Sequence, residues 1–244
     1  MISNAVIVGS TPAVYISGGL DSTIILHHLR QKTEEKIYTY TFGFPDDDEF
    51  DYARKVADYY ETNHTEILIR EFLPRFPEIL KHFERPRWNI WIYWLAEQAQ
   101  KDARKTCYTG EGCDEHFGGY YYKPKKSYLE KWVDHFVYVL PTYNTVHTLF
   151  GLTLEQPFTR LDWTKSYLYF DHENMKTHLR KAYRNLLPKF VVERQKQRGG
   201  PDYWKLWKRE LRTFFPGIIP NTEEEIRNLL NLYATKTWLN LFSS

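Results

Sequence analysis

The sequence has only a small excess of positive charge and little cysteine, and each shortage limits what the protein can be. It contains 33 Lys and Arg against 31 Asp and Glu, a net charge of +2, so no strong field points to a nucleic acid partner. Two cysteines, Cys107 and Cys113, cannot build a disulfide framework and belong to no CxxC pair or metal-spaced cluster. A reducing, cytoplasmic compartment fits this usage best.

Long apolar runs and a leader pattern are missing as well. No apolar stretch approaches the ~18 residues that a membrane-spanning helix needs. The first residues also lack a basic segment followed by an apolar one. Because hydrophobic residues still make up 42% of the 244 residues, the chain can bury a sizeable core. We therefore expect a soluble globular protein with no membrane partner.

Strand-like and helix-like patterns alternate in the first half of the chain. Runs rich in β-branched and aromatic residues are separated by stretches with helical spacing of apolar residues. This alternation predicts an α/β fold with a doubly wound, mostly parallel sheet over residues 1–125, and a helical part over residues 126–244 packed on it. The predicted strands are 13–16, 37–44, 65–69 and 105–109, and the predicted helices between them include 21–30 and 90–103.

A glycine-rich turn follows the first predicted strand. Gly18 and Gly19 let the backbone approach a ligand closely, and the N–H groups at the start of the next helix attract an anion. No Lys follows them, so this is not the Gly-x-x-x-x-Gly-Lys-Ser/Thr phosphate loop. Asp21 would repel a bare phosphate unless a hard cation such as Mg²⁺ bridges the two. An ordinary strand-to-helix turn capped by Ser and Asp is the alternative.

A second glycine-rich loop, 109–120, follows the fourth predicted strand. It places four glycines around three carboxylates. Asp114 is the natural second ligand for a cation held by Asp21, which leaves Glu111 for another task. Each of these acids, taken alone, is equally typical of an exposed loop charge.

The two loops together resemble those of a known family. The segments Ser17-Gly-Gly-Leu-Asp-Ser22 and Gly110-Glu-Gly-Cys-Asp-Glu-His-Phe-Gly-Gly-Tyr120 closely resemble the synthetase domain of glutamine-dependent asparagine synthetases. These are relatives of the β-lactam synthetases in the N-type ATP pyrophosphatase class, which has an adenine-nucleotide α-hydrolase-like fold. The likeness continues to Arg194-Gln-Lys196, which precedes two glycines, and spans nearly the whole chain.

The resemblance implies a chemistry and a set of site residues. In that family a carboxylate attacks the α-phosphate of ATP to give an acyl-adenylate and pyrophosphate, and an amine then displaces AMP. Glu111 and Lys196 match the family's catalytic residues, and Asp21 and Asp114 would hold Mg²⁺. The residues that match its ATP-binding positions are Ile16, Ser17, Gly18, Gly19, Leu20, Asp21, Ser22, Thr23, Phe42, Thr109 and Gly110.

The sequence departs from the family at two places. Whole asparagine synthetases begin with a glutaminase domain, whereas this chain reaches its phosphate loop within 17 residues, so we expect free ammonia, a separate glutaminase subunit or another amine to supply nitrogen. Thr142, Thr153 and Glu155 stand where the family carries Arg, Glu and Arg. Because an Arg is the expected partner of a substrate carboxylate, aspartate is in doubt as the acceptor acid.

We therefore expect an ATP-dependent, AMP- and pyrophosphate-forming amide ligase that takes a small-molecule carboxylate and ammonia or an amine. One alternative is the amidation or cyclisation of an acid other than aspartate, such as a peptide or a metabolite. Another is an ATP pyrophosphatase that modifies tRNA, against which the weak net charge argues. A nucleotide-binding scaffold that partners a glutaminase is the option without catalysis.

Overall fold

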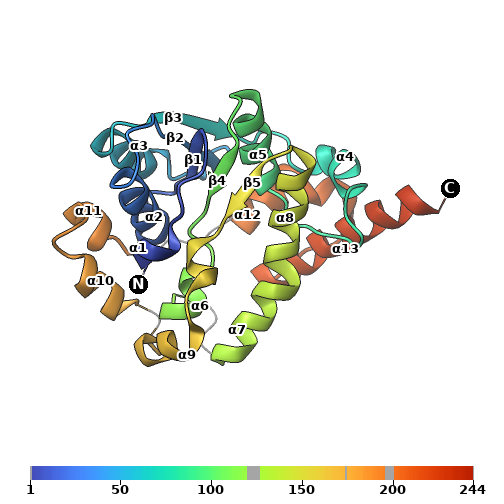
Figure 1. Ribbon diagram of the computed structural model, residues 1–244. Coiled ribbons are helices and arrows are strands. Elements are labelled where there is room, and N and C mark those ends of the chain that lie inside the picture. The colour runs from blue at the N-terminus through green and yellow to red at the C-terminus, as the bar shows by residue number, and fades with distance from the viewer. Residues whose placement is uncertain (1, 120–126, 174, 196–200, 244) are drawn as a thin grey trace.

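Five parallel strands form one sheet in the order β3-β2-β1-β4-β5 (Figure 1). The computed structural model describes residues 2–119, 127–173, 175–195 and 201–243. The order confirms the predicted α/β fold with a doubly wound, parallel sheet. The strands are β1 (Pro12–Tyr15), β2 (Tyr38–Gly43), β3 (Asn63–Leu68), β4 (Thr106–Tyr108) and β5 (Thr153–Glu155).

Successive side chains of the central strand enter two different cores. Ala13 and Tyr15 belong to one buried hydrophobic cluster, and Val14 belongs to the other. This alternation follows from the two-residue period of a strand, and it requires helices on both faces of the sheet. β4 shows the same division, because Cys107 lies in the first cluster and Tyr108 in the second.

Helices from both halves of the chain cover each face. The cluster around Val14 is completed mainly by α2, α3, α10 and α11, and the cluster around Tyr15 by α4, α5, α8, α12 and α13. The helices are α1 (Ile2–Ala5), α2 (Leu20–Arg30), α3 (Phe50–Tyr59), α4 (Phe76–Leu80), α5 (Ile92–Lys101), α6 (Cys113–Phe117), α7 (Tyr128–Asp134), α8 (Leu140–Leu149), α9 (Trp163–Ser166), α10 (Thr177–Tyr183), α11 (Lys189–Val192), α12 (Tyr203–Arg209) and α13 (Glu223–Phe242).

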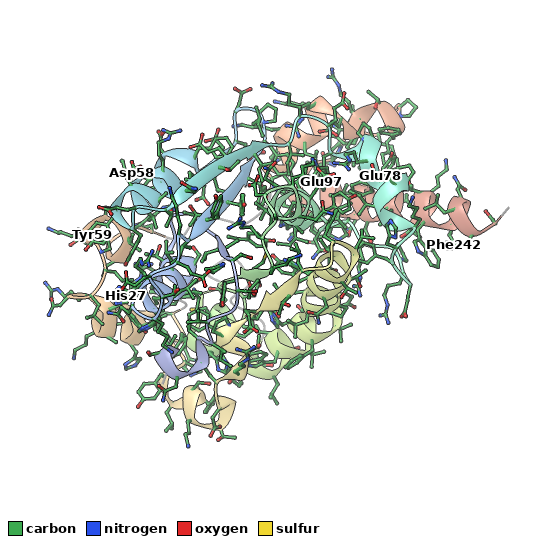
Figure 2. The ribbon with its side chains drawn as sticks, turned by 45° about the horizontal axis from the view of Figure 1, so that its top comes forward. His27, Asp58, Tyr59, Glu78, Glu97 and Phe242 are labelled. Atoms are coloured by element: carbon green, nitrogen blue, oxygen red, sulfur yellow. The ribbon has the colours of Figure 1, made fainter. Side chains whose placement is uncertain are left out.

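The helices that cover the two faces of the sheet lie at opposite sides of the molecule. Figure 2 shows His27 and Tyr59, from α2 and α3, at the side opposite to Phe242 at the end of α13. Within the described part of the chain, no helix combines the length and the apolar character needed to cross a membrane.

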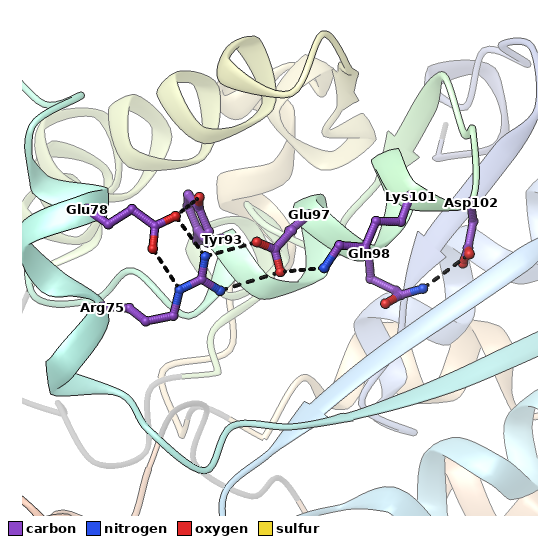
Figure 3. Close-up of polar contacts among 7 residues, drawn as sticks. All are labelled: Arg75, Glu78, Tyr93, Glu97, Gln98, Lys101 and Asp102. Atoms are coloured by element: carbon purple, nitrogen blue, oxygen red, sulfur yellow. Dashed lines mark hydrogen bonds and ion pairs between the residues drawn. The ribbon is translucent and has the colours of Figure 1, made fainter.

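A polar network ties α4 and α5 together beside the sheet (Figure 3). The Arg75 guanidinium donates to Glu78 and to Glu97, at 2.9 Å in each case, and Lys101 donates to Glu97 at 3.0 Å. The Tyr40 hydroxyl, from β2, donates to Asp102 at 2.7 Å just past the end of α5. These contacts fix α5 against the sheet and thus the start of β4.

One strand was not expected. The strand signal fades after residue 125, but β5 pairs with β4 in parallel and becomes the edge of the sheet. The chain winds from β1 to β2 and β3 in one direction and then returns to β4 and β5 on the other side of β1. The direction of winding therefore reverses between β1 and β4, which is where open α/β sheets bind ligands.

Candidate active site

The first glycine-rich loop leaves β1 at this reversal point and enters α2 at Leu20, one residue earlier than predicted. Gly18 has φ +69°, and a Cβ there would lie 2.5 Å from the backbone carbon of Tyr52, so only glycine fits. The cap residue of α2 is Gly19, whose carbonyl accepts a 2.7 Å hydrogen bond from the Thr23 hydroxyl. Since glycine has no side chain to cover the first N–H groups of α2, they suit an anion.

The second glycine-rich loop leaves β4 and packs against the start of α2. A Cβ on Gly110 would lie 2.8 Å from the backbone nitrogen of Ser22 and 2.9 Å from Cβ of Asp21. Gly112, at φ +90°, then turns the chain into α6. The two loops are thus in direct contact, because glycine at position 110 lets their backbones approach.

Asp21 and Asp114 are brought together by these loops, and both contact the ammonium group of Lys176. Lys176 Nζ is 2.5 Å from Asp21 Oδ1 and forms a second ion pair with Asp114 Oδ1. Burial would lower the pKa of Lys176, but the carboxylates of Asp114 and Asp21 outweigh it and raise the pKa well above its ordinary value. Lys176 therefore stays charged at neutral pH. Lys176 was not singled out from the sequence.

The segment before α10 holds Lys176 in place. The backbone N–H of Asp171 donates to the carbonyl of Phe117 at 3.1 Å, which docks the segment on the end of α6. The Asp171 carboxylate accepts from the backbone N–H and hydroxyl of Thr177, at 2.8 and 2.7 Å. Lys176 itself has φ +55°, a left-handed conformation that directs the chain into α10.

The donors at this point fit Mg²⁺ when a polyphosphate supplies the rest of its coordination. Two carboxylate oxygens converge on one cationic group, and Mg²⁺ typically takes one or two carboxylates together with substrate phosphates. Among the described residues, no group of three or more His, Cys, Asp or Glu side chains could hold a metal ion. Asp21 and Asp114 could thus supply two of the oxygen ligands of such an ion.

Glu111 lies half-buried in the same loop beside Tyr143 of α8. The Tyr143 hydroxyl donates a 3.0 Å hydrogen bond to Glu111 Oε1. Burial raises the pKa of Glu111, and the nearby Glu115 and Asp114 carboxylates act in the same direction. Tyr143 was not singled out from the sequence, and neither was a histidine from another helix whose ring lies against Glu115.

That histidine is His135, on the π-helical turn between α7 and α8. Its Nδ1 lies 3.4 Å from Glu115 Oε1, and both side chains are buried. Burial lowers the pKa of His135, but the Glu115 carboxylate reverses this and leaves the pKa above its ordinary value. Two negative carboxylates, Glu111 and Asp114, also favour the protonated imidazole. The surrounding carboxylates thus favour an imidazolium behind the acidic loop.

The residues expected around the adenosine lie at the carboxyl ends of three neighbouring strands. The Ile16 N–H donates to the carbonyl of Tyr40, and the Thr109 N–H donates to the carbonyl of Glu155, at 2.9 and 3.1 Å. Phe42 stacks on Trp91, with ring centroids 6.3 Å apart. Ser17 lies in the first loop, and Leu20 and Ser22 lie in the first turn of α2.

Lys196, the second expected catalytic residue, lies outside the described residues. Arg194, two positions earlier, anchors the preceding chain to the first loop. One of its guanidinium nitrogens donates to the carbonyl of Ser17 at 2.7 Å, another pairs with Glu49, and the group lies 3.8 Å from the ring centroid of Tyr52.

Two of the three positions that depart from the family pattern have internal side-chain contacts, and the third, Thr153, is exposed at the start of β5. The buried Thr142 hydroxyl donates to the carbonyl of Tyr138 in the preceding turn, at 2.9 Å. Glu155 forms an ion pair with Arg160, which also donates to the carbonyl of Ala5. The negative charge that Glu155 carries in place of the family's arginine is therefore neutralised by Arg160.

Comparison with known proteins places the chain in a family. The model of the asparagine synthase family matches residues 10–168. A probable glutamine-hydrolysing asparagine synthetase of Dictyostelium discoideum is 33% identical over 129 residues, 45% of this chain and 23% of that protein. The glutamine-hydrolysing asparagine synthetase of Zea mays is 26% identical over 265 residues, 93% of this chain and 45% of that protein.

The chain therefore spans less than half the length of the curated relatives it matches here. Among solved structures, the NMN synthetase of Francisella tularensis aligns with a TM-score of 0.46 and 13% identity, covering 97% of this chain and 91% of that one. The family match, which covers both glycine-rich loops and the sheet, carries the assignment. The chain belongs to the asparagine synthase family.

Proposed function

We propose that the protein is an AMP-forming, ATP-dependent amide ligase that adenylates a carboxylate and transfers the acyl group to ammonia or an amine. The observation that carries the proposal is the direct contact of two glycine-rich loops at the reversal point of the sheet, with Asp21 and Asp114 converging on one cationic position. Family membership supports the ligase chemistry.

Residues 17–23 would bind the polyphosphate through the backbone N–H groups of the α2 start and the hydroxyls of Ser17 and Ser22. Asp21 and Asp114 would hold Mg²⁺, which neutralises phosphate charge when bound. Ile16, Phe42, Thr109 and Gly110 would surround the adenosine. Arg194 would keep the chain leading to Lys196 next to the first loop.

Glu111 would act on protons at the reacting centre. A carboxyl group with a raised pKa can accept a proton from an attacking amine near neutral pH. Tyr143 orients this carboxylate through its hydroxyl hydrogen bond. Lys196 would stabilise the negative charge on the phosphoryl and acyl-transfer states. A separate glutaminase subunit or free ammonia would supply the nitrogen.

The acceptor acid is proposed to differ from aspartate. Thr142 is satisfied by its own helix and Glu155 by Arg160, so neither position offers a cationic group to a second carboxylate of the substrate. These contacts favour the amidation or cyclisation of a monocarboxylic acid.

Pyrophosphate release tests the proposal over a panel of acids and amines, with aspartate and ammonia first and monocarboxylic acids second. ATP-to-AMP turnover that depends on one acid and Mg²⁺ is expected. The Lys196→Ala variant should lose at least ~100-fold in turnover, whereas the matched variant Lys189→Ala, at an exposed lysine of α11, should keep it. Formation of ADP, or no turnover with any acid, would contradict the proposal.

A further inference from the structure

Lys176 lies between the two carboxylates that the proposed function assigns to Mg²⁺. Its side chain is only 4% exposed, so water cannot replace the carboxylates as its partners. Asp21 and Asp114 are themselves only 23% and 14% exposed. One ammonium group thus forms ion pairs with two largely buried carboxylates.

The close packing around this triad limits where a second cation could lie. A Cβ on Gly119 would lie 1.9 Å from Asp114 Oδ1 and 2.6 Å from Cε of Lys176. A divalent cation that bridged Asp21 and Asp114 through the same oxygens would lie next to the ammonium, and the two positive charges would repel each other strongly in this partly buried place. The metal and the ammonium are therefore alternative partners of the carboxylate pair.

The backbone of Lys176 is fixed, whereas its side chain has a long flexible stem. Asp171 holds the start of α10 through Thr177, and the Lys176 carbonyl accepts from the Arg180 N–H at 2.9 Å. Because the four-carbon stem has several rotatable bonds, a change of partner by the ammonium would not require the α10 backbone to move. A polyphosphate on the first loop is the kind of new partner that could receive it.

We propose that Lys176 closes the Asp21 and Asp114 pair to free divalent cations, so that Mg²⁺ enters only together with a polyphosphate that takes over the ammonium. The inference rests on the proposed function, because it needs a nucleotide at this loop. Lys176 is then a positioning residue that enforces joint entry of metal and nucleotide, and it keeps the two acids from facing each other unbalanced.

Mn²⁺ binding, followed by the electron paramagnetic resonance signal of the free ion, tests this without turnover. The native protein should bind Mn²⁺ in the presence of α,β-methylene-ATP and bind Mn²⁺ alone at least ~10-fold more weakly. The Lys176→Met variant should bind Mn²⁺ without the ATP analogue, so most of the difference between the two affinities should disappear. Lys176→Gln, which keeps an N–H donor for the carboxylates, is the second variant and should behave in the same way. Lys165→Met, at an exposed lysine paired with Asp162, is the matched control.

The outcomes separate the two proposals. If the native protein binds no Mn²⁺ with the ATP analogue, the proposed function fails. If it does, but both Lys176 variants bind Mn²⁺ alone as weakly as the native protein, the inference about Lys176 is wrong. The double variant Lys176→Met with Asp114→Asn should lose the gained Mn²⁺ binding, and retention of that binding would show that the metal lies elsewhere and overturn the inference.

Discussion

The hydroxyl of Tyr143 donates a 3.0 Å hydrogen bond to Oε1 of Glu111 and thereby links α8 to the second glycine-rich loop. The same tyrosine accepts, at its backbone carbonyl, a 2.7 Å hydrogen bond from His147 Nδ1, and His147 Nε2 in turn accepts from the Tyr15 hydroxyl of β1 at 3.0 Å. Glu111 is therefore held by a chain of buried contacts that begins in the central strand.

Tyr143→Phe should move the acidic limb of the pH-rate profile upward. The hydroxyl stabilises the Glu111 carboxylate and so lowers its pKa, and its loss should raise that pKa by about one pH unit, given ~1.5 kcal/mol for a hydrogen bond to a charged group. Because a base must be deprotonated, activity should then require a higher pH. Turnover between pH 5 and 9 is the measurement, with the exposed Tyr169→Phe as the control. An unchanged profile would show that the Tyr143 hydroxyl does not affect the catalytic base.

Glu111→Gln should lower turnover by about 100-fold while leaving ATP binding within a few-fold, because the amide keeps the shape but cannot accept the proton. Steady-state kinetics and calorimetric titration with the ATP analogue measure the two effects. Glu193→Gln, at an exposed glutamate of similar chemistry, should change neither. A loss confined to the Michaelis constant would assign Glu111 to binding alone.

Gly110→Ala should weaken nucleotide binding by about 10-fold or more, because a Cβ 2.8 Å from the Ser22 nitrogen must push the two loops apart. Titration with α,β-methylene-ATP measures the affinity. Gly151→Ala is the control, since Gly151 also has a positive φ of +64° but has open space around it. That variant should cost about 1 kcal/mol of stability without affecting the nucleotide. Equal affinities for both variants would argue against loop contact.

The stability of the protein should fall as the pH is lowered from about 6.5 to about 4. Burial lowers the pKa of His147 to about 4, from 6.5 in an exposed histidine, so the unfolded chain binds the proton first and acid favours unfolding across this window. The buried His28 and His116 act in the same direction. Urea denaturation at several pH values measures the free energy of unfolding.

His147→Gln isolates the contribution of one residue, because glutamine does not titrate and can still donate to the Tyr143 carbonyl. Between pH 6.5 and 4, the free energy of unfolding should fall by about 3 kcal/mol less in the variant than in the native protein. This difference corresponds to a pKa difference near 2.5. His178→Gln, at an exposed histidine, is the control variant. An identical slope in native protein and His147→Gln would mean that the pKa of His147 is the same in the folded and the unfolded chain.

The fold was largely predictable because the composition of β1 to β4 and the residues that follow them form a local pattern. The runs that form β1 to β4 are rich in β-branched and aromatic residues, and the glycines after β1 and β4 mark their ends. β5 was missed because, unlike the equally short but buried β4, it begins with an exposed residue, Thr153, and no glycine-rich loop follows it. Its pairing with β4 is a tertiary effect that no local pattern records.

The candidate site was predictable only where motifs are contiguous. Asp21 and Asp114 could be placed together because the carboxyl ends of parallel strands meet at one edge of a sheet. Lys176 could not be placed with them, because its partner Asp21 is 155 positions away in the sequence. The residues beside Lys176 also resemble any polar helix start. Tyr143 is likewise one of 19 tyrosines, and only the packing of α8 against α5 and β5 sets it apart.

The burial of α13 predicts what truncation of the chain would do to the amount of protein in a cell. Ile226, Leu230 and Ala234 of α13 are fully buried in the same cluster as Ala13 and Tyr15 of the central strand. A nonsense mutation upstream of α13 would therefore uncover apolar surface that reaches toward the central sheet, and unfolded chains of this kind are removed by proteases. We expect such an allele to behave as a loss of protein abundance and not as a change of substrate specificity.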